Sequence, residues 1–256
     1  MRFMARIVVF DSGFGSLSVI KPIQKAIKSD LIYYADQKNF PYGRKSKSQL
    51  TKIITNRIKF LEEKFKPDLI VVGSNTPSLL VKINKKNVVK VLPPIKIAAK
   101  ISVTGNIAIL TTLTAVKSKK LSEFIKKNRL PKRINIKKIN ASRLIQLVES
   151  AKFIDNQNLC NRVVRKTLSE QFSKYNIDVA TLSSTHLPFL LPFLKKQFPL
   201  VTFLDPAQEI ANKVGKILGK KSSKRNSMKI FTSSEPEKFQ NHLWKMGIKK
   251  KVSFLN

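Results

Sequence analysis

Short apolar runs alternate with helical patterns along most of the chain. The runs with the length and composition of buried strands are residues 6–10, 31–34, 68–72, 107–110, 134–136, 179–182 and 201–204. Apolar positions recur at helical spacing in residues 17–27, 48–65, 142–148 and 156–175. Strands that alternate with helices in this way predict an α/β fold with mostly parallel sheets.

An internal repeat links strands that are about 100 residues apart. Residues 6–12 resemble residues 106–112, and residues 68–77 resemble residues 178–188. In the second pair an aspartate stands six residues before Ser74 or Ser184, and further polar residues and a proline follow. The repeat indicates two α/β halves built alike. Because ligands of open α/β sheets bind beyond the carboxyl ends of the strands, we expect the polar residues of both halves to converge.

The composition is that of a globular chain with a sizeable core. Of 256 residues, 42% are hydrophobic and 16 are phenylalanine, which excludes a disordered tail protein. The single Cys160 excludes an internal disulfide, and with two histidines it gives no basis for a Cys-rich zinc site, so we expect no metal. We find neither a secretory signal nor an apolar segment long enough to cross a membrane. We expect a cytoplasmic protein without a membrane partner.

The charge balance raises a second class of partner. Fifty Lys and Arg residues against 15 Asp and Glu residues give a net charge of +35, which favours polyanions such as nucleic acid. The lysine pairs are spread along the chain, however, and no stacking motif of the RNA-binding type accompanies them. We therefore favour solvated surface lysines and keep nonspecific polyanion contact as an alternative. Such contact would start at residues 216–229, which we interpret as an exposed basic loop.

The polar residues after the first strand have two interpretations. The run Asp-Ser-Gly-Phe-Gly-Ser at residues 11–16 is a weak match to a phosphate-binding turn, because the third glycine of the dinucleotide motif is missing. We favour Asp11 as a group oriented towards a small ligand or an acid/base partner. An Asx turn or a helix cap is the alternative.

The two serine clusters, residues 74–76 and 184–186, each follow a predicted strand. Hydroxyl groups, amide groups and backbone N–H groups at such a junction suit a carboxylate ligand, whereas simple helix capping is the alternative. His186 lies beside the second cluster and favours a site there. A Ser–His hydrolase is a weaker alternative, because Gly-x-Ser-x-Gly is absent. Residues 40–43 predict a turn that either places the hydroxyl of Tyr42 or only packs.

Together these motifs resemble the cofactor-independent aspartate/glutamate racemase superfamily and, within it, the glutamate racemase family. The resemblance covers nearly the whole chain, including residues 10–19, 34–46, 73–76 and 182–188. Ser16 stands where the family usually has glycine. Gly-Ser-Asn-Thr at 73–76 stands where it has Ala-Cys-Asn-Thr, and Ser183-Ser184 stands where it has Gly-Cys.

The resemblance implies two pseudosymmetric α/β domains with mostly parallel sheets and an active-site cleft between them. The first domain would comprise residues 1–98 plus 209–256, and the second residues 99–208. The implied substrate is an acidic amino acid, glutamate or aspartate, and neither pyridoxal phosphate nor any other cofactor is implied. The implied catalytic positions are Asp11, Ser74, Ser184, His186 and Glu149. The implied substrate-binding positions are Ser12, Tyr42, Gly43, Asn75, Thr76, Thr112 and Thr185.

The two positions that carry thiols in the family are both serine here. A cysteine with a pKa near 8.5 can be tuned into a thiolate, whereas a serine hydroxyl is far less acidic. We therefore do not expect ordinary two-thiol racemisation. We expect either a slow racemase that uses Asp11 and His186 directly, or a catalytically silent binder of acidic amino acids. Association into a homodimer is left open.

Overall fold

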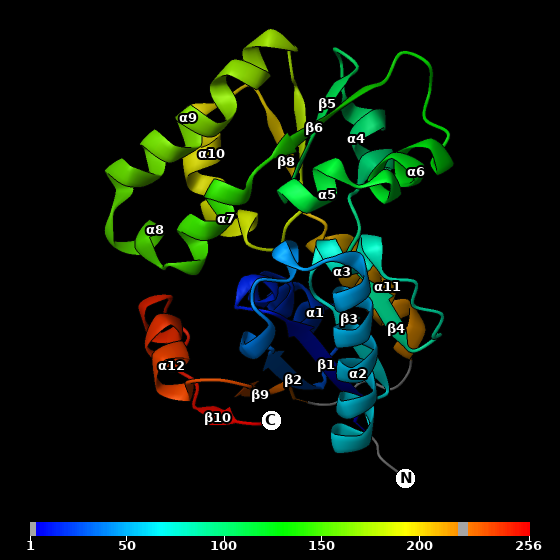
Figure 1. Cartoon of the computed structure of the whole chain (residues 1–256), viewed down its shortest axis with the longest axis vertical. Coiled ribbons are helices and arrows are strands. Elements are labelled where there is room, and N and C mark those ends of the chain that lie inside the picture. Colours follow the sequence, from blue (N-terminus) through cyan, green and yellow to red (C-terminus); the bar gives the residue numbers. More distant parts are fainter. Residues whose placement is uncertain (1–3, 220–224) are drawn as a thin grey trace. The chain divides into compact units, whose positions relative to one another are not determined.

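The computed structural model describes residues 4–219 and 225–256. The centre of the predicted basic loop, residues 220–224, lies outside the described residues. The chain divides into two compact units, Met1–Val91 with Ala207–Asn256, and Leu92–Pro206. Each unit is an α/β body whose sheet is parallel throughout, as predicted (Figure 1). In the described parts of the chain, no helix is long and apolar enough to cross a membrane.

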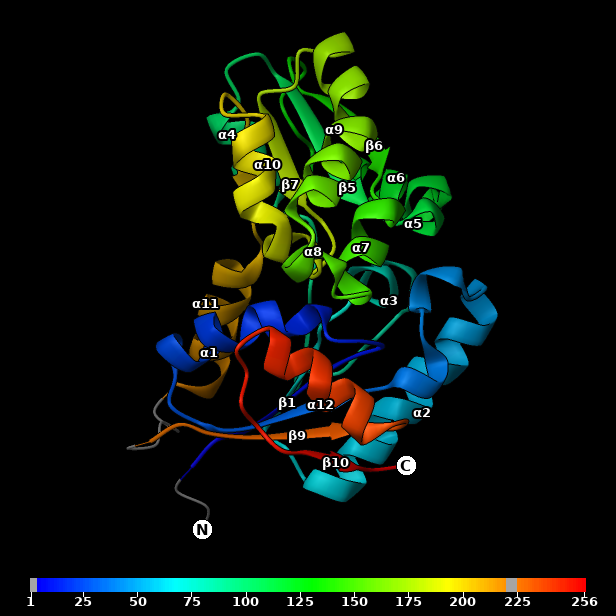
Figure 2. The same cartoon turned by 90° about the vertical axis from the view of Figure 1, so that its left-hand side faces the viewer.

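The first unit contains a six-stranded sheet in the order β10-β9-β2-β1-β3-β4. Its strands are β1 (Arg6–Asp11), β2 (Asp30–Ala35), β3 (Leu69–Val72), β4 (Val88–Lys90), β9 (Ser227–Thr232) and β10 (Val252–Phe254). Its helices are η1 (Gly15–Val19), α1 (Ile20–Ala26), η2 (Gln37–Asn39), η3 (Tyr42–Arg44), α2 (Lys47–Phe65), α3 (Asn75–Leu80), α11 (Ala207–Leu218) and α12 (Pro236–Lys245). Helix α2 covers one face of the sheet, and α1 and α11 cover the other (Figure 2).

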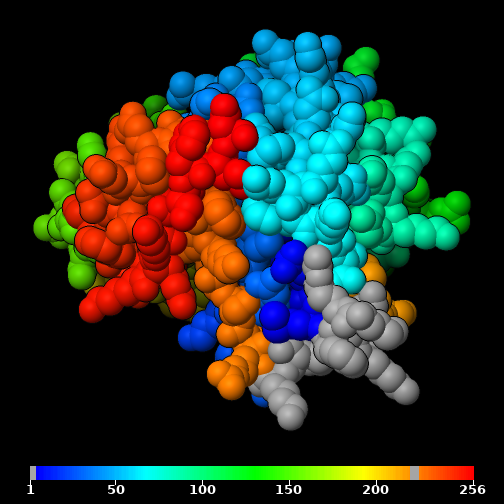
Figure 3. All heavy atoms as spheres, turned by 90° about the horizontal axis from the view of Figure 1, so that it is seen from below, coloured from blue at the N-terminus to red at the C-terminus, as the bar shows by residue number. Residues whose placement is uncertain are grey.

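The core of the first unit explains why these segments fold together. Alternate residues of β1, β2 and β3 face the apolar stripe of α2, which contributes Leu50, Ile54, Ile58 and Leu61. Helix α2 begins at a capping box, in which the Ser46 hydroxyl and the Gln49 side chain bond each other's backbone N–H. The C-terminal segment lies beside α2 (Figure 3), where the rings of Phe65 and Phe231 are 5.3 Å apart.

The second unit contains a four-stranded sheet in the order β6-β5-β7-β8. Its strands are β5 (Asn106–Thr111), β6 (Asn135–Asn140), β7 (Val179–Leu182) and β8 (Thr202–Leu204). Its helices are α4 (Ile95–Ile101), α5 (Leu113–Lys117), α6 (Lys119–Lys127), α7 (Ser142–Glu149), α8 (Lys152–Asp155), α9 (Gln157–Lys174), η4 (Leu187–Leu190) and α10 (Leu191–Gln197).

The internal repeat seen in the sequence is also a repeat of sheet topology. The order β2-β1-β3-β4 in the first unit matches β6-β5-β7-β8 in the second. The register repeats as well, because Ile7 pairs with Leu69 and Ile107 pairs with Val179. The prediction of two α/β halves built alike is therefore confirmed.

The repeated aspartates lie at the opposite end of the strands from the serines. Asp68 accepts a hydrogen bond from the backbone N–H of Arg6. Asp178 accepts from the Ser102 hydroxyl at 2.7 Å and from the backbone N–H groups of Val103 and Thr104. Each aspartate thus ties the start of its strand to a neighbouring segment, which is a role in the fold.

Asp178→Asn is expected to destabilise the protein by about 1.5–3 kcal/mol at pH 7, because it removes charge-assisted hydrogen bonds. Burial alone would raise the pKa of Asp178, but hydrogen bonds from Ser102, Thr104 and Val103 outweigh burial and lower it. A lowered folded-state pKa means that this stabilisation is present above the unfolded pKa of about 3.9. It is lost as the pH falls through the folded-state pKa.

Urea denaturation at pH 7 and at pH 3 measures both effects. The exposed Glu170→Gln serves as the control for loss of one negative charge. An equal loss of stability in the Asp178 variant at both pH values would contradict the assignment.

Candidate functional site

Asp11 ends β1 and organises the loop that follows it. Its side chain is fully buried, Oδ1 accepts from the backbone N–H of Ser12 at 2.7 Å, and Oδ2 accepts from that of Ser16 at 3.2 Å. These bonds come from residues one and five positions further on, so the Asp11 carboxylate holds the loop after β1 in place. The ligand-directed role of Asp11 stays a prediction.

Ser74 and Asn75 lie where β3 passes into α3. Ser74 is the N-cap residue, but its side chain makes no capping hydrogen bond. Asn75 is 2% exposed, and neither its Oδ1 nor its Nδ2 has a hydrogen-bond partner. Thr76 is also 2% exposed. Buried amide groups normally have hydrogen-bond partners. The Asn75 side chain is therefore a candidate for binding a polar ligand.

Tyr42 is fixed by a buried polar network centred on Asp36. The Tyr42 hydroxyl donates to Asp36 Oδ2 at 2.8 Å, and Asn39 Nδ2 donates to both carboxylate oxygens. Arg57 completes the network, with Nη2 at 2.9 Å from Asp36 Oδ1 and Nη1 donating to the Tyr34 hydroxyl at 2.7 Å. The aromatic hydroxyl of this loop is therefore engaged inside the protein.

Burial and the adjacent Asp36 carboxylate raise the pKa of Tyr42 well above its usual value, which keeps the phenol protonated as a donor. On the other side of Tyr42, its backbone N–H approaches the Ser12 hydroxyl at 3.5 Å. Gly43 follows Tyr42 within η3. If this loop binds a ligand, we expect its backbone groups, and not the Tyr42 hydroxyl, to make the contact.

The second unit holds a hydroxyl, an imidazole and a carboxylate in series. Ser184 Oγ lies 3.3 Å from His186 Nδ1, and His186 Nε2 lies 2.9 Å from Glu149 Oε1. Ser184 and His186 are each 6% exposed. Glu149 ends α7, whereas Ser184 and His186 lie between β7 and η4. Packing of α7 against η4 therefore brings the carboxylate to the imidazole.

Three threonines lie at or just after the carboxyl ends of β5 and β7 in the second unit. Thr112 caps α5, and its Oγ1 accepts from the backbone N–H of Ala115 at 3.2 Å. Thr185 is 2% exposed. Thr111 was not among the predicted site residues, yet its buried Oγ1 has no hydrogen-bond partner. Its position at the end of β5, in the repeat of Asp11, was the signal that could have identified it.

Two of the departures from the family pattern in the first unit, Ser16 and Gly73, lie against each other. A Cβ atom added to Gly73 would collide with the Ser16 side chain and would meet the Phe10 carbonyl oxygen at 3.1 Å. Ser16 therefore fills the space that a methyl group at position 73 would need. The Ser16 hydroxyl also lies 3.3 Å from the Tyr33 hydroxyl.

Cys160 and His242 lie apart from these clusters. Cys160 is buried in α9, and burial raises the pKa of its thiol, so it gives no reactive thiolate. His242 lies on α12 with its ring edge-on to Phe14 at 6.1 Å. Among the described residues, no group of three His, Cys, Asp or Glu side chains could hold a metal ion.

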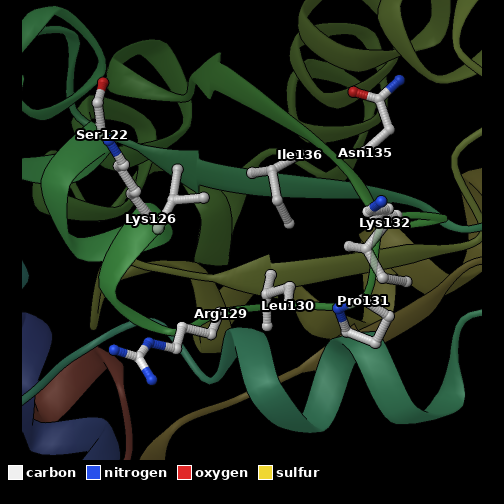
Figure 4. Close-up of a pocket in the computed structure, with 10 residues that line it drawn as sticks. Ser122, Lys126, Arg129, Leu130, Pro131, Lys132, Asn135 and Ile136 are labelled. Atoms are coloured by element: carbon white, nitrogen blue, oxygen red, sulfur yellow. The ribbon is translucent and has the colours of Figure 1, made fainter.

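A hollow of about 450 Å³ lies between α6 and β6 in the second unit. Leu130, Pro131 and Ile136 form its apolar part, and the Arg129 guanidinium extends to one side (Figure 4). Lys126 and Lys132 also line it. Its lining includes none of the predicted site residues, and polyanion contact at such a basic surface stays a prediction.

Two curated relatives match almost the whole chain. A glutamate racemase of Bartonella quintana is 31% identical over 272 residues, which cover 97% of this chain and 97% of the relative. The chain belongs to the glutamate racemase family. A glutamate racemase of Actinobacillus pleuropneumoniae is 30% identical and covers 91% of this chain and 90% of the relative. No protein-family model matches the chain.

Solved glutamate racemases have the same fold as this family member. The structure of an isoform from Bacillus anthracis has a TM-score of 0.87 at 23% identity and covers 98% of this chain and 97% of its own. The Escherichia coli enzyme, solved with L-glutamate and the activator UDP-MurNAc-Ala, has a TM-score of 0.81 at 24% identity and covers 98% of each chain. The curated relatives thus confirm the superfamily resemblance read from the motifs, and the solved structures confirm the two-domain α/β fold.

Proposed function

We propose that this glutamate racemase-like chain slowly exchanges the α-proton of glutamate or aspartate without a cofactor. The observation that supports the proposal best is the series Ser184–His186–Glu149. Its imidazole is positioned by a carboxylate and lies within reach of the hydroxyl that replaces a family thiol. An imidazole oriented in this way is a competent general acid or base.

The second proton-transfer group is Asp11, which the family resemblance pairs with the thiol position held here by Ser74. A serine hydroxyl is too weakly acidic to act as the base itself, so we assign the base role to the carboxylate. We propose that both groups act on the same α-carbon and that Asp11 removes or returns the proton on the face opposite His186. Because neither group is a thiolate and both family thiols are replaced by hydroxyls, we expect exchange to be slow.

The remaining predicted residues would bind the amino acid. Asn75, with an unsatisfied amide, would bond its ammonium or carboxylate groups. The hydroxyl and backbone groups of the other predicted binding positions would bind the rest, namely Ser12, Tyr42, Gly43, Thr76, Thr112 and Thr185. We propose the domain limits 1–98 plus 209–256 and 99–208 for the two halves that contribute them.

Deuterium from solvent is expected to appear at the α-carbon of added glutamate or aspartate, and proton NMR at high enzyme concentration measures it. His186→Gln should abolish exchange because it removes the acid/base group, whereas Lys59→Met, at an exposed position on α2, should leave it unchanged. Absence of exchange after prolonged incubation would contradict the racemase proposal.

A silent binder of acidic amino acids is the second candidate, and the unsatisfied amide of Asn75 favours it. On this proposal, calorimetry detects glutamate or aspartate binding while no deuterium is incorporated. Asn75→Ala should then weaken binding. If no acidic amino acid binds, this candidate is also wrong.

A further inference from the structure

The series of Ser184, His186 and Glu149 can do more than transfer a proton. A carboxylate at 2.9 Å from Nε2 favours the tautomer in which Nε2 carries the hydrogen and donates it to Glu149. The other nitrogen, Nδ1, then carries the lone pair and lies 3.3 Å from Ser184 Oγ. An acid that orients a histidine, which in turn faces a hydroxyl, is the arrangement that activates a serine nucleophile.

The burial of His186 and Glu149 and the contacts of the neighbouring Ser183 support this arrangement. The side chains of His186 and Glu149 are 8% and 12% exposed. The hydrogen bond between them is therefore stronger than the same bond would be at an exposed surface. The neighbouring Ser183 does not compete for the imidazole, because its hydroxyl bonds Thr181 Oγ1 at 2.8 Å. The Ser183 hydroxyl is therefore engaged with Thr181, and the Ser184 hydroxyl lies next to the imidazole.

The internal repeat supplies a comparison within the same chain. Ser74 occupies the position in the first unit that Ser184 occupies in the second. Two residues further on, however, the first unit has Thr76 where the second has His186. The two serines thus hold equivalent places in the repeat but differ in the neighbouring base, so they should differ in reactivity.

We propose that Ser184 is an activated nucleophile for acyl transfer and takes small activated esters as substrates. Ser184 Oγ attacks the ester carbonyl carbon as its proton passes to His186 Nδ1. The ester C–O bond then breaks, and the leaving alcohol takes that proton. Water, deprotonated at Nδ1, next attacks the acyl-enzyme, the acyl–Ser184 bond breaks, and the carboxylic acid is released as the serine is restored. All three residues belong to the second unit, so this activity does not rest on the proposed racemisation.

Diisopropyl fluorophosphate tests the nucleophile directly. Attack by Ser184 Oγ on phosphorus releases fluoride and leaves a diisopropylphosphoryl group that peptide mass spectrometry locates. We expect the adduct on Ser184 and none on Ser74. Ser184→Ala should abolish it, and His186→Gln should slow its formation by about 10²–10⁴-fold. Ser183→Ala, at the adjacent hydroxyl, is the matched control and should label at the unmodified rate.

Glu149 is a positioning residue in this proposal, and 4-nitrophenyl acetate hydrolysis tests it. Glu149→Gln should lower kcat more than it raises KM and should shift the pH profile, whereas Glu149→Asp should restore part of the rate. A merely structural role would move neither the profile nor the split between kcat and KM.

Three results would overturn the proposal: no adduct on the unmodified chain, an adduct that persists in Ser184→Ala, or labelling that His186→Gln leaves unchanged. Thermal melts of each variant identify any loss that is due to misfolding. The deuterium exchange measurement separates the two proposals. Exchange without labelling would refute the nucleophile, and labelling without exchange would refute the racemase.

Discussion

Cysteine at both positions 74 and 184 is expected to raise racemisation of glutamate by about 10²–10⁴-fold over the unmodified chain. A thiol with a pKa near 8.5 reaches the thiolate form at far lower cost than a hydroxyl, and each pKa unit is worth about 1.36 kcal/mol. At position 184 the new thiol would lie beside His186, whose Nδ1 is 3.3 Å from the present hydroxyl. Circular dichroism of D- and L-glutamate mixtures measures the rate.

The single variants test whether both thiols are needed for the gain in rate. Ser74→Cys or Ser184→Cys alone should gain much less, because inversion needs a proton donor on one face and an acceptor on the other. Ser183→Cys is the matched control, since it adds a thiol next to the site at a hydroxyl already bonded to Thr181. If the double variant is no faster than the unmodified chain, the loss of thiols is not what limits this family member.

Arg57→Met is expected to destabilise the protein by about 3–5 kcal/mol, because it leaves the Asp36 carboxylate buried without its countercharge. The Asp36 side chain is fully buried and that of Arg57 is 15% exposed. The guanidinium also lies 4.9 Å from the Tyr34 ring and 5.2 Å from the Phe60 ring. The variant therefore loses a charge pair and two aromatic contacts, and urea denaturation measures the sum.

A second variant separates the charge from the packing. Adding Asp36→Asn to Arg57→Met removes the unpaired charge and should recover most of the lost stability. Lys59→Met, on the same helix but 77% exposed, should change the urea midpoint little. If Arg57→Met unfolds at the urea concentration of the unmodified protein, the network does not hold the Tyr42 loop.

Much of the fold could be predicted because the internal repeat marks equivalent strands in the two units. The strand before Ser74 and the strand before Ser184 were both identified, and their pairing with β1 and β5 follows from the topology of parallel sheets. Edge strands were harder to predict. The pattern indicated residues 134–136, whereas β6 runs from Asn135 to Asn140, because Lys137 and Lys138 interrupt the apolar run of this edge strand. The short strands β4, β9 and β10 gave no strong signal.

The sequence identified residues that belong to the candidate site, but it could not predict the contacts between them. The motifs identified His186 and Glu149, yet their distance depends on how α7 packs against η4. The turn at residues 40–43 was expected either to place the Tyr42 hydroxyl or only to pack, and the structure directs that hydroxyl to Asp36. No local pattern could reveal that Arg57, one position on an ordinary amphipathic helix, reaches this carboxylate.

The contact between Gly73 and Ser16 limits how this chain can be returned to the family sequence. Transplanting the whole motif Ala-Cys-Asn-Thr would bring a methyl group into volume that the Ser16 side chain already fills. The graft could then fail through a steric clash and be mistaken for a failure of the thiol. Position 73 should stay glycine unless position 16 is changed with it, so the two positions have to be engineered together.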